Sequence, residues 1–206
     1  NEVGTWILRT ACEAATSWRR KGLLPIRVAV NLFQRQLYDP SFVEEVQKIL
    51  AGANLPPSSL EIEITENIAL SHTAPTLRPL HKLKEMGVQL AFDDFGTGYA
   101  SLSFLTQMPL TRIKIDRSFV RGIPFDDKAS AIVRSLIDMA HNIGLQVVAE
   151  GVETLQQAYF LRSAGCDEAQ GFLFAKPLPV SGFETLLKTT APNDQLYHSR
   201  RIALKA

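Results

Sequence analysis

The period of the hydrophobic positions changes repeatedly along the chain and divides it into alternating helices and strands. In "SLEIEITE" (59–66) apolar and polar residues alternate strictly, which is typical of a strand. In "DDKASAIVRSLIDMAHNIG" (126–144) apolar residues recur at helical spacing until Gly144 ends the pattern. These two periods predict strands at 26–33, 59–66, 88–95, 145–153 and 168–179, a strand that opens 111–120, and helices at 4–22, 39–55, 72–87, 126–144, 154–165 and 180–191.

Two local features complete this pattern. Ser41 is the expected N-cap of the helix at 39–55, because a serine side chain can accept from the first backbone N–H groups. The segment 100–108 is expected to form a short helix or a turn. The six strands therefore alternate with helices, which indicates a parallel sheet, either open or closed into a barrel.

Polar residues at the ends of the strands favour the closed form. They are Asn31, Glu63, Asp93 with Asp94, Lys114 with Asp116, Glu150, and Gln170. In an eight-stranded βα barrel, functional groups gather at the carboxyl ends of many strands at once. A doubly wound sheet concentrates them at one switch point, often with a glycine-rich phosphate turn, and no such turn follows the first strand. We therefore predict an α/β fold of the TIM-like (β/α)8 barrel class.

The chain supplies six of the eight strands that this fold requires. It begins at Asn1, inside a helical pattern, and its 206 residues lie near the low end of the roughly 200 to 400 usual for the fold. We therefore expect the first two strands to be absent from this chain. The predicted organisation is one incomplete domain over 1–190, followed by a C-terminal tail at 191–206 that has no clear core pattern.

Composition narrows the possible partners and the compartment. Hydrophobic residues make up 46% and charged residues 21%, which is ordinary for a globular protein, and the net charge of +1 gives no reason to expect DNA or a membrane surface as a partner. Cys12 and Cys166 provide no disulfide framework and favour a reducing compartment. No stretch is apolar enough to cross a bilayer. We expect a cytoplasmic domain, with membrane attachment of a parent protein left open.

The polar strand ends have the chemistry of a metal site. Four carboxylates and one amide would meet at the barrel mouth, namely Glu63, Asp93, Asp94, Glu150 and Asn31. Carboxylates that converge in this way require cations, and donor sets made only of oxygen suit Mg²⁺ or Mn²⁺ rather than zinc. Adjacent Asp93 and Asp94 could serve two ions, about 3.5–4 Å apart, which is the usual arrangement for cleaving phosphate esters. Lys114 would then place a positive charge near the attacking water or the phosphoryl oxygens.

Each of these residues, taken singly, also has an ordinary structural explanation. A pair of aspartates after a strand is commonly a turn or a helix cap. Glu61, Glu63 and Glu66 could form a solvated strand face. Lys114 and Asp116 share a face of their strand and could form an internal ion pair. Strands of a parallel sheet, however, are buried on both faces, so a carboxylate there needs a partner.

Six segments carry a resemblance to a known family. They are "VNLFQRQL", "EIEITE", "DDFGTGYASL", "KIDRSFV", "VVAEGVET" and "GCDEAQGFLFAKPLP". In this order and spacing they resemble the EAL domain family of bacterial cyclic di-GMP phosphodiesterases, from about Trp6 to Phe183. The resemblance implies a barrel whose first strand is antiparallel to the others. It also implies hydrolysis of cyclic di-GMP to linear pGpG with Mg²⁺ or Mn²⁺ and inhibition by Ca²⁺, in the bacterial signalling that regulates biofilm and motility.

The resemblance assigns a role to each strand-end residue. It implies that Asn31, Glu63 and Asp93 bind a first ion, that Asp93 bridges, and that Asp94 and Glu150 bind a second ion. Glu150 is also implied as a catalytic base.

Further implied roles concern the surroundings of the ions. Lys114 would contact the attacking water, and Glu66 would anchor the loop after Asp94. Glu153 and Gln170 would support the site, and Asp116 and Gln170 would contact the substrate. A homodimer through the loop and helix after Asp94 is implied as well.

The chain departs from the family pattern in two places. The Glu-Ala-Leu motif, whose glutamate is a metal ligand, is absent together with the first two strands, and "CEAAT" at 12–16 does not replace it because it lies on a helix. Phe33 stands where a small serine usually follows the asparagine by two residues. Three hypotheses remain: an active phosphodiesterase, a catalytically incompetent EAL-like module that senses cyclic di-GMP, and a scaffold that binds a partner. The retained acids and Lys114 favour the first.

We expect the 206-residue chain by itself to hydrolyse cyclic di-GMP weakly or not at all. The physical reasons are the absent carboxylate ligand and a sheet edge with unpaired backbone groups. Turnover of cyclic di-GMP by the isolated chain in the presence of Mg²⁺ measures this directly. Rapid hydrolysis by the chain alone would show that the expectation is wrong.

Overall fold

Among the residues that the structure describes, six strands form one parallel sheet in the order of the sequence. The computed structural model describes residues 2–23, 26–65, 74–96 and 105–189, so the expectations for Glu66, for most of 100–108 and for the tail lie outside the described residues. The strands are β1 (Val28–Asn31), β2 (Leu60–Ile64), β3 (Gln89–Phe95), β4 (Arg112–Ile115), β5 (Gln146–Ala149) and β6 (Glu168–Ala169). Every neighbouring pair is parallel, as predicted.

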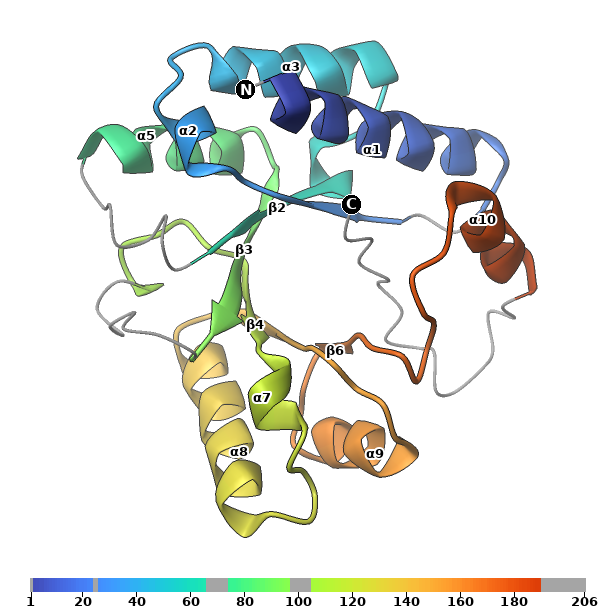
Figure 1. Cartoon of the computed structure of the whole chain (residues 1–206). Helices are drawn as coiled ribbons and strands as arrows, with labels where there is room; N and C mark the ends of the chain where they lie inside the picture. The colour runs from blue at the N-terminus through green and yellow to red at the C-terminus, as the bar shows by residue number, and fades with distance from the viewer. Residues whose placement is uncertain (1, 24–25, 66–73, 97–104, 190–206) are drawn as a thin grey trace.

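The sheet curls strongly, as Figure 1 shows. Because of this curl, Arg27, the residue before β1, reaches Glu168 of β6, the strand at the other edge of the sheet, with 3.0 Å between the guanidinium and a carboxylate oxygen. The described strands therefore form a large part of a barrel wall with an interior of their own.

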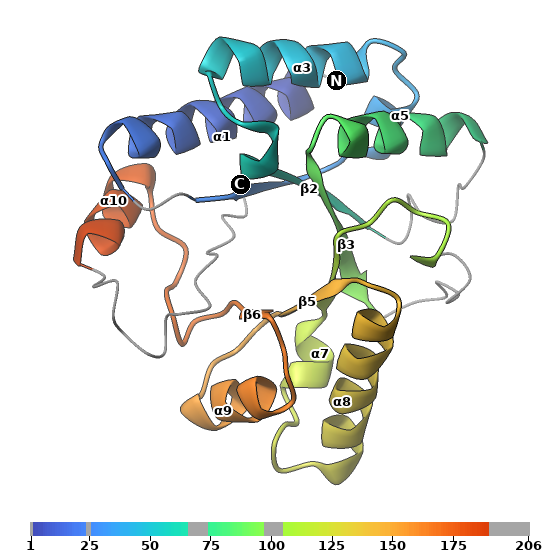
Figure 2. The same cartoon turned by 180° about the vertical axis from the view of Figure 1, so that it is seen from behind.

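Helices cover the outer face of the sheet (Figures 1 and 2). They are α1 (Glu2–Arg20), α2 (Gln34–Leu37), α3 (Phe42–Ala53), α5 (Ala74–Glu85), α7 (Arg117–Val120), α8 (Asp127–Asn142), α9 (Leu155–Ser163) and α10 (Val180–Thr189), with a 3₁₀ turn at Pro57–Ser59. Both figures place α1, α3 and α5 on one side of the curled sheet and α7, α8 and α9 on the other. None of the helices in the described ranges has the length and apolar character that crossing a bilayer requires.

Three local expectations need correction. Ser41 is at the N-cap position of α3, but its side chain does not cap the helix. Its backbone is already in the helical region (φ −85°, ψ −8°), where a cap needs an extended backbone, and its hydroxyl is turned toward Asp39 Oδ1, to which it donates at 2.6 Å. The last strand is only two residues long, where 168–179 was expected to contain a longer one. It ends where Gly171 passes so close to Val152 that no side chain fits between the two backbones. The short helices α2 and α7 were not predicted, since four residues are too few to show a period.

The two faces of the strands differ in chemistry. Outward side chains such as Leu60, Ile62 and Ile113 are almost fully buried against the helices and belong to the hydrophobic core. Inward side chains include Glu61 and Glu63, which are only 3% and 0% exposed. The explanation of these glutamates as a solvated strand face is therefore wrong. The core lies between the sheet and its helices, and charged groups line the interior of the curl.

The first and last described helices pack together through one aromatic pair. Trp18 of α1 is 1% exposed, and its ring lies 5.0 Å, centroid to centroid, from the ring of Phe183 in α10. This contact joins α10 to the helices around the sheet.

We expect Trp18→Ala to lower the free energy of unfolding by about 3–5 kcal/mol, because it removes a large buried ring and leaves a cavity. The matched control is Trp6→Ala on the same helix, where the side chain is 66% exposed, and there we expect a change below about 0.5 kcal/mol. Urea unfolding followed by circular dichroism measures both. Equal losses in the two variants would show that the Trp18–Phe183 contact does not stabilise the fold.

Candidate metal centre

A buried ammonium group occupies the middle of the site. Lys114 of β4 is 1% exposed, and its Nζ lies 2.5 Å from Glu63 Oε1, 2.7 Å from Asp93 Oδ1 and 2.6 Å from Glu150 Oε1. These carboxylates come from β2, β3 and the residue after β5. Four neighbouring strands therefore contribute to one cluster, as the polar strand ends predicted.

The carboxylates determine the charge state of this lysine. Burial acts to lower the pKa of Lys114, but Glu63, Glu150 and Asp93 outweigh burial and hold the pKa above its ordinary value. Lys114 therefore keeps its proton at neutral pH and can only donate hydrogen bonds. Its ion-pair partners in the described residues do not include Asp116, so the alternative explanation of Lys114 and Asp116 as an internal ion pair is not supported.

Asp94 faces the site because the strand is irregular there. In a regular strand, adjacent side chains point to opposite faces. Asp94, however, has a φ of 55°, in the left-handed region that aspartate tolerates better than most residues, and the pairing of β3 with β4 shifts between Phe92 and Phe95. As a result, carboxylate oxygens of Asp93, Asp94 and Glu150 all lie within 4.8 Å of one another.

This donor set fits a hard divalent cation. Three clustered carboxylates offer only oxygen, which is what Mg²⁺ and Mn²⁺ prefer. Asn31 ends β1 and pairs in register with Glu63, so this half-buried residue lies beside the cluster. Asn31, Glu63, Asp93, Asp94 and Glu150 could thus together surround cations at the carboxyl end of the sheet.

The tilt of the strands explains why residues from alternate strands reach the same level. Asn31 of β1 pairs with Glu63 of β2, which in turn pairs with Ala91 of β3, two residues before Asp93. Ala91 pairs with Arg112 of β4, which pairs with Gln146 of β5, four residues before Glu150. A shift of two residues for every second strand is the stagger of a barrel, in which alternate strands supply each interior layer. Asn31, Asp93 and Glu150 form the uppermost of these layers.

Gln170 joins the cluster, whereas two other predicted residues lie beside it. The Gln170 amide Nε2 donates to Glu150 Oε1, and its Oε1 is buried with no hydrogen-bond partner among the described residues. Asp116 caps α7 by accepting from the Ser118 backbone N–H at 2.9 Å. Glu153 is exposed.

Asp116 remains ionised next to the site. Burial acts to raise the pKa of its carboxyl group, but hydrogen bonds from Ser118 and the positive charge of Arg117 lower the pKa below its usual value. A negative charge at this position is therefore present throughout the neutral range.

Two glycines let the loops after the ligands pass close to α7. Gly96, two residues after Asp94, has a φ of +97°, and a Cβ there would lie 2.7 Å from the Phe119 ring. Gly151 follows Glu150 with a φ of +69°, and a Cβ there would lie 2.4 Å from the Cβ of Arg117. Helix α7 therefore packs between the two segments that follow these ligands.

Gln157 is a positioning residue that the sequence interpretation missed. Its buried Oε1 accepts from the backbone N–H groups of Glu153, at 2.8 Å, and Thr154, at 3.0 Å, while Nε2 donates to the Val120 carbonyl at 3.1 Å. It thereby fixes the loop after Glu150 against the end of α7. The sequence signal was present, because Thr154 and Gln157 have the spacing of a capping box.

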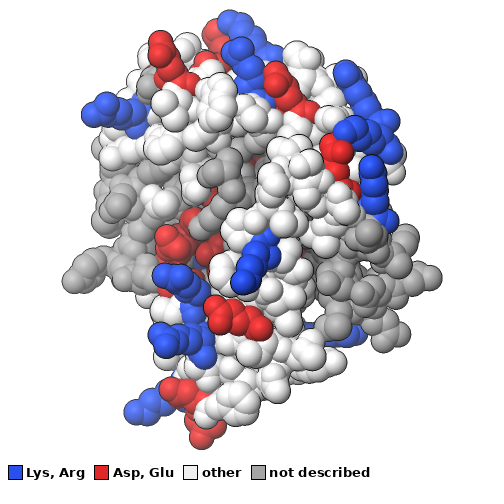
Figure 3. Space-filling view, turned by 45° about the vertical axis from the view of Figure 1, so that its right-hand side comes forward, with Lys and Arg blue, Asp and Glu red and all other residues white. Residues whose placement is uncertain are grey.

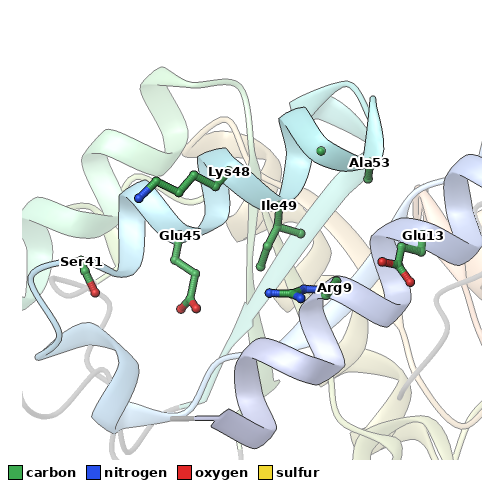
Figure 4. A pocket seen from close by; sticks show the side chains of 8 residues that line it. Arg9, Glu13, Ser41, Glu45, Lys48, Ile49 and Ala53 are labelled. Atoms are coloured by element: carbon green, nitrogen blue, oxygen red, sulfur yellow. The ribbon is translucent and has the colours of Figure 1, made fainter.

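A surface pocket elsewhere is unrelated to this cluster. Figure 4 shows a pocket of about 500 Å³ between α1 and α3, lined by Arg9, Glu13, Ser41, Glu45, Lys48, Ile49, Gly52 and Ala53. It lies within the helical layer and contains none of the acidic cluster's residues. The candidate site is therefore defined by its charges and not by this cavity.

The chain belongs to the EAL domain family, which it matches over residues 1–177. It is 42% identical over 188 residues to the cyclic di-GMP phosphodiesterase NbdA of Pseudomonas aeruginosa, an alignment that covers 91% of this chain and 24% of NbdA. An uncharacterized signaling protein of Caulobacter vibrioides is 44% identical over 178 residues, covering 86% of this chain and 22% of that protein. The chain thus spans about a quarter of the length of these relatives.

Solved structures of the family share the fold. The EAL domain of Mycobacterium smegmatis DcpA superposes with a TM-score of 0.86 at 44% identity, over 93% of this chain and 86% of that one. The phosphodiesterase PaMucR in complex with cyclic di-GMP gives 0.82 at 37% identity, over 88% and 74%. Klebsiella pneumoniae BlrP1 with manganese and cyclic di-GMP gives 0.74 at 36%, over 82% and 42%. The predicted class, a TIM-like barrel of the EAL type, is confirmed.

We expect Gly96→Ala to weaken Mn²⁺ binding about tenfold or more. The new methyl group requires a strained backbone and displaces the Phe119 ring, which shifts the end of β3, where Asp93 and Asp94 lie. The control is Gly52→Ala in α3, where nothing lies within 4 Å of the new Cβ and a gain of up to about 1 kcal/mol in stability is expected. Calorimetric titration with Mn²⁺ measures both variants, and unchanged affinity in Gly96→Ala would argue against this role of Gly96.

Proposed function

We propose that this chain carries a phosphodiesterase site that hydrolyses cyclic di-GMP to linear pGpG. The observation that supports it most directly is the protonated Lys114 among Glu63, Asp93 and Glu150, with Asp94 turned back toward them. The similar proteins described above include named cyclic di-GMP phosphodiesterases and a cyclic di-GMP complex. A buried cluster of one cation and four acids is suited to phosphate ester hydrolysis with divalent ions.

Two ions, Mg²⁺ or Mn²⁺, are proposed as cofactors. Asn31, Glu63 and Asp93 would hold one ion, with Asp93 bridging to a second held by Asp94 and Glu150. When bound, such ions lower the pKa of a water molecule and neutralise charge on the phosphoryl oxygens. Ca²⁺, which is larger and more flexible in its coordination, is expected to occupy the same donors and inhibit.

The side chains of this chain then perform the remaining steps. In the hydrolysis, the water oxygen bonds to phosphorus, one ester P–O bond breaks, and a proton reaches the departing ribose oxygen. Glu150, whose Oε1 accepts a hydrogen bond from Gln170, is proposed to accept the proton of the water. Lys114 keeps its own proton and donates a hydrogen bond to the water or to a phosphoryl oxygen. Asp116 and Gln170 are proposed to contact the substrate, and Glu66 and Glu153 to support the loops.

The remaining expectations about the whole protein stay predictions. A homodimer through the loop and helix after Asp94 concerns residues that are largely outside the described ranges. The described surface in Figure 3 mixes basic and acidic side chains, in keeping with the small net charge. The cytoplasmic location and the division into a domain at 1–190 and a tail are likewise proposals.

We expect Lys114→Ala and Asp93→Asn each to lower kcat by at least about 10²-fold, because each removes a charge that faces the reacting phosphate. Cyclic di-GMP binding should survive, since base and phosphate contacts are spread over the mouth. Lys128→Ala, an exposed lysine of α8, is the matched control and should retain the parental rate. The full-length protein is titrated calorimetrically with cyclic di-GMP in Ca²⁺, and turnover is then measured in Mg²⁺ or Mn²⁺.

The results separate the two leading functions. Binding with Ca²⁺ and hydrolysis with Mg²⁺ or Mn²⁺ would support the phosphodiesterase. Binding without hydrolysis in either metal would identify a sensor module and contradict the proposal. Parental rates in Lys114→Ala would exclude the assigned role of this lysine.

A further inference from the structure

A second buried charge cluster lies in the interior of the curled sheet, next to the site. This floor cluster consists of Arg27, Glu61, Arg112 and Glu168. Arg112 is 1% exposed, and its Nε and Nη1 lie 2.9 Å from Glu61 Oε2 and 2.9 Å from Glu168 Oε2. Arg27 approaches the same two carboxylates, at 3.1 and 3.0 Å. Each arginine bridges both glutamates, and the formal charges of the four groups sum to zero.

The floor cluster lies beneath the layer that contains Lys114, on the same interior face of the sheet. Glu61 and Glu63 are two residues apart on β2, and Arg112 and Lys114 are two residues apart on β4. Residues two apart in a strand share a face and are separated by about 6.6 Å along it. The floor cluster and the layer that contains Lys114 therefore face the same interior, one above the other.

No other charge separates the two layers among the described strand residues. The interior positions between them are Ala29, Ala91 and Val148, which carry no polar side-chain group. Burial raises the pKa of Glu61, while the positive charges of Arg112, Arg27 and, to a smaller extent, Lys114 act to lower it, so the charge of Lys114 reaches Glu61. Glu61 and Glu168, if they were not neutralised, would attract the Lys114 ammonium away from the carboxylates above it.

We propose that Arg112 is a positioning residue that acts through Lys114. It holds Glu61 and Glu168 in a neutral cluster, so that the Lys114 ammonium is attracted only toward Glu63, Asp93 and Glu150. Arg112 touches neither substrate nor ions in this assignment. The inference rests on the proposed function for its kinetic consequence, but its structural consequence, the location of the ammonium, is independent of turnover.

The test compares floor clusters of different net charge in the full-length protein. Arg112→Met leaves a net charge of −1, whereas Arg112→Met with Glu168→Gln returns the sum to zero. We expect the single variant to lose at least about tenfold in kcat, with KM for cyclic di-GMP within about threefold. The double variant should recover kcat to within about threefold of the parent. Arg162→Met, an exposed arginine of α9, is the matched control and should retain the parental kcat.

A second variant keeps the test informative if Arg112→Met does not fold, and a second measurement does so if the protein shows no turnover. If Arg112→Met does not fold, Arg27→Met creates the same −1 charge from the edge of the cluster and should show the same loss and the same rescue by Glu168→Gln. Lysine-selective ¹⁵N NMR locates the Lys114 ammonium without turnover, and its resonance should shift in the single variant and return in the double variant.

Two outcomes would overturn the proposal. One is a folded −1 variant with parental kcat and an unmoved Lys114 resonance. The other is a double variant that regains parental stability to urea but not kcat, since the cluster would then act only in joining β1 to β6. Absence of hydrolysis in the parent protein would contradict the proposed function alone, and the Lys114 resonance would still decide the role of Arg112.

Discussion

The ammonium of Lys114 can lie inside the sheet only because three carboxylates surround it. A lysine with 1% exposure would otherwise lose its proton or destabilise the fold, since burial alone disfavours its charged form. Glu63 and Asp93, which are 0% and 2% exposed, are likewise tolerated inside the sheet only because a cationic partner lies next to them. The cluster is therefore one electrostatic unit, and the sheet must hold its members within about 3 Å for any of them to be tolerated.

This requirement explains the unusual distribution of chemistry across the strands. Outward positions are apolar and pack against helices, while inward positions alternate between charged layers and small apolar residues. A neutral floor cluster with two arginines and two glutamates fills the lower part of the interior. In the upper cluster, Lys114 contacts three carboxylates, and Asp94 adds a fourth acid close to two of them. The excess of acid at the carboxyl ends of the strands is what a divalent cation would neutralise, which is why this end, and not the other, has the character of a metal site.

Much of the fold could be predicted from the sequence, because the two hydrophobic periods mark its elements. All six strands and the six longer helices lie where the alternation and the helical spacing placed them. The short helices α2 and α7 were missed, since four residues show no period. The cap at Ser41 was wrong because the backbone of Ser41 is already helical and turns the hydroxyl toward Asp39, which depends on the local backbone path.

The sequence by itself determined the residue types and the strand positions of the candidate site. The polar residues that end the strands identified Glu63, Asp93, Lys114 and Glu150, and the family motifs gave their expected roles. Only the tertiary structure decided which groups meet. Asp94 turns back to Asp93 through one left-handed residue, and Arg27 pairs with Glu168 across 141 positions of the chain. Both depend on the curl and stagger of the assembled sheet, which bring together residues that no period along the chain relates.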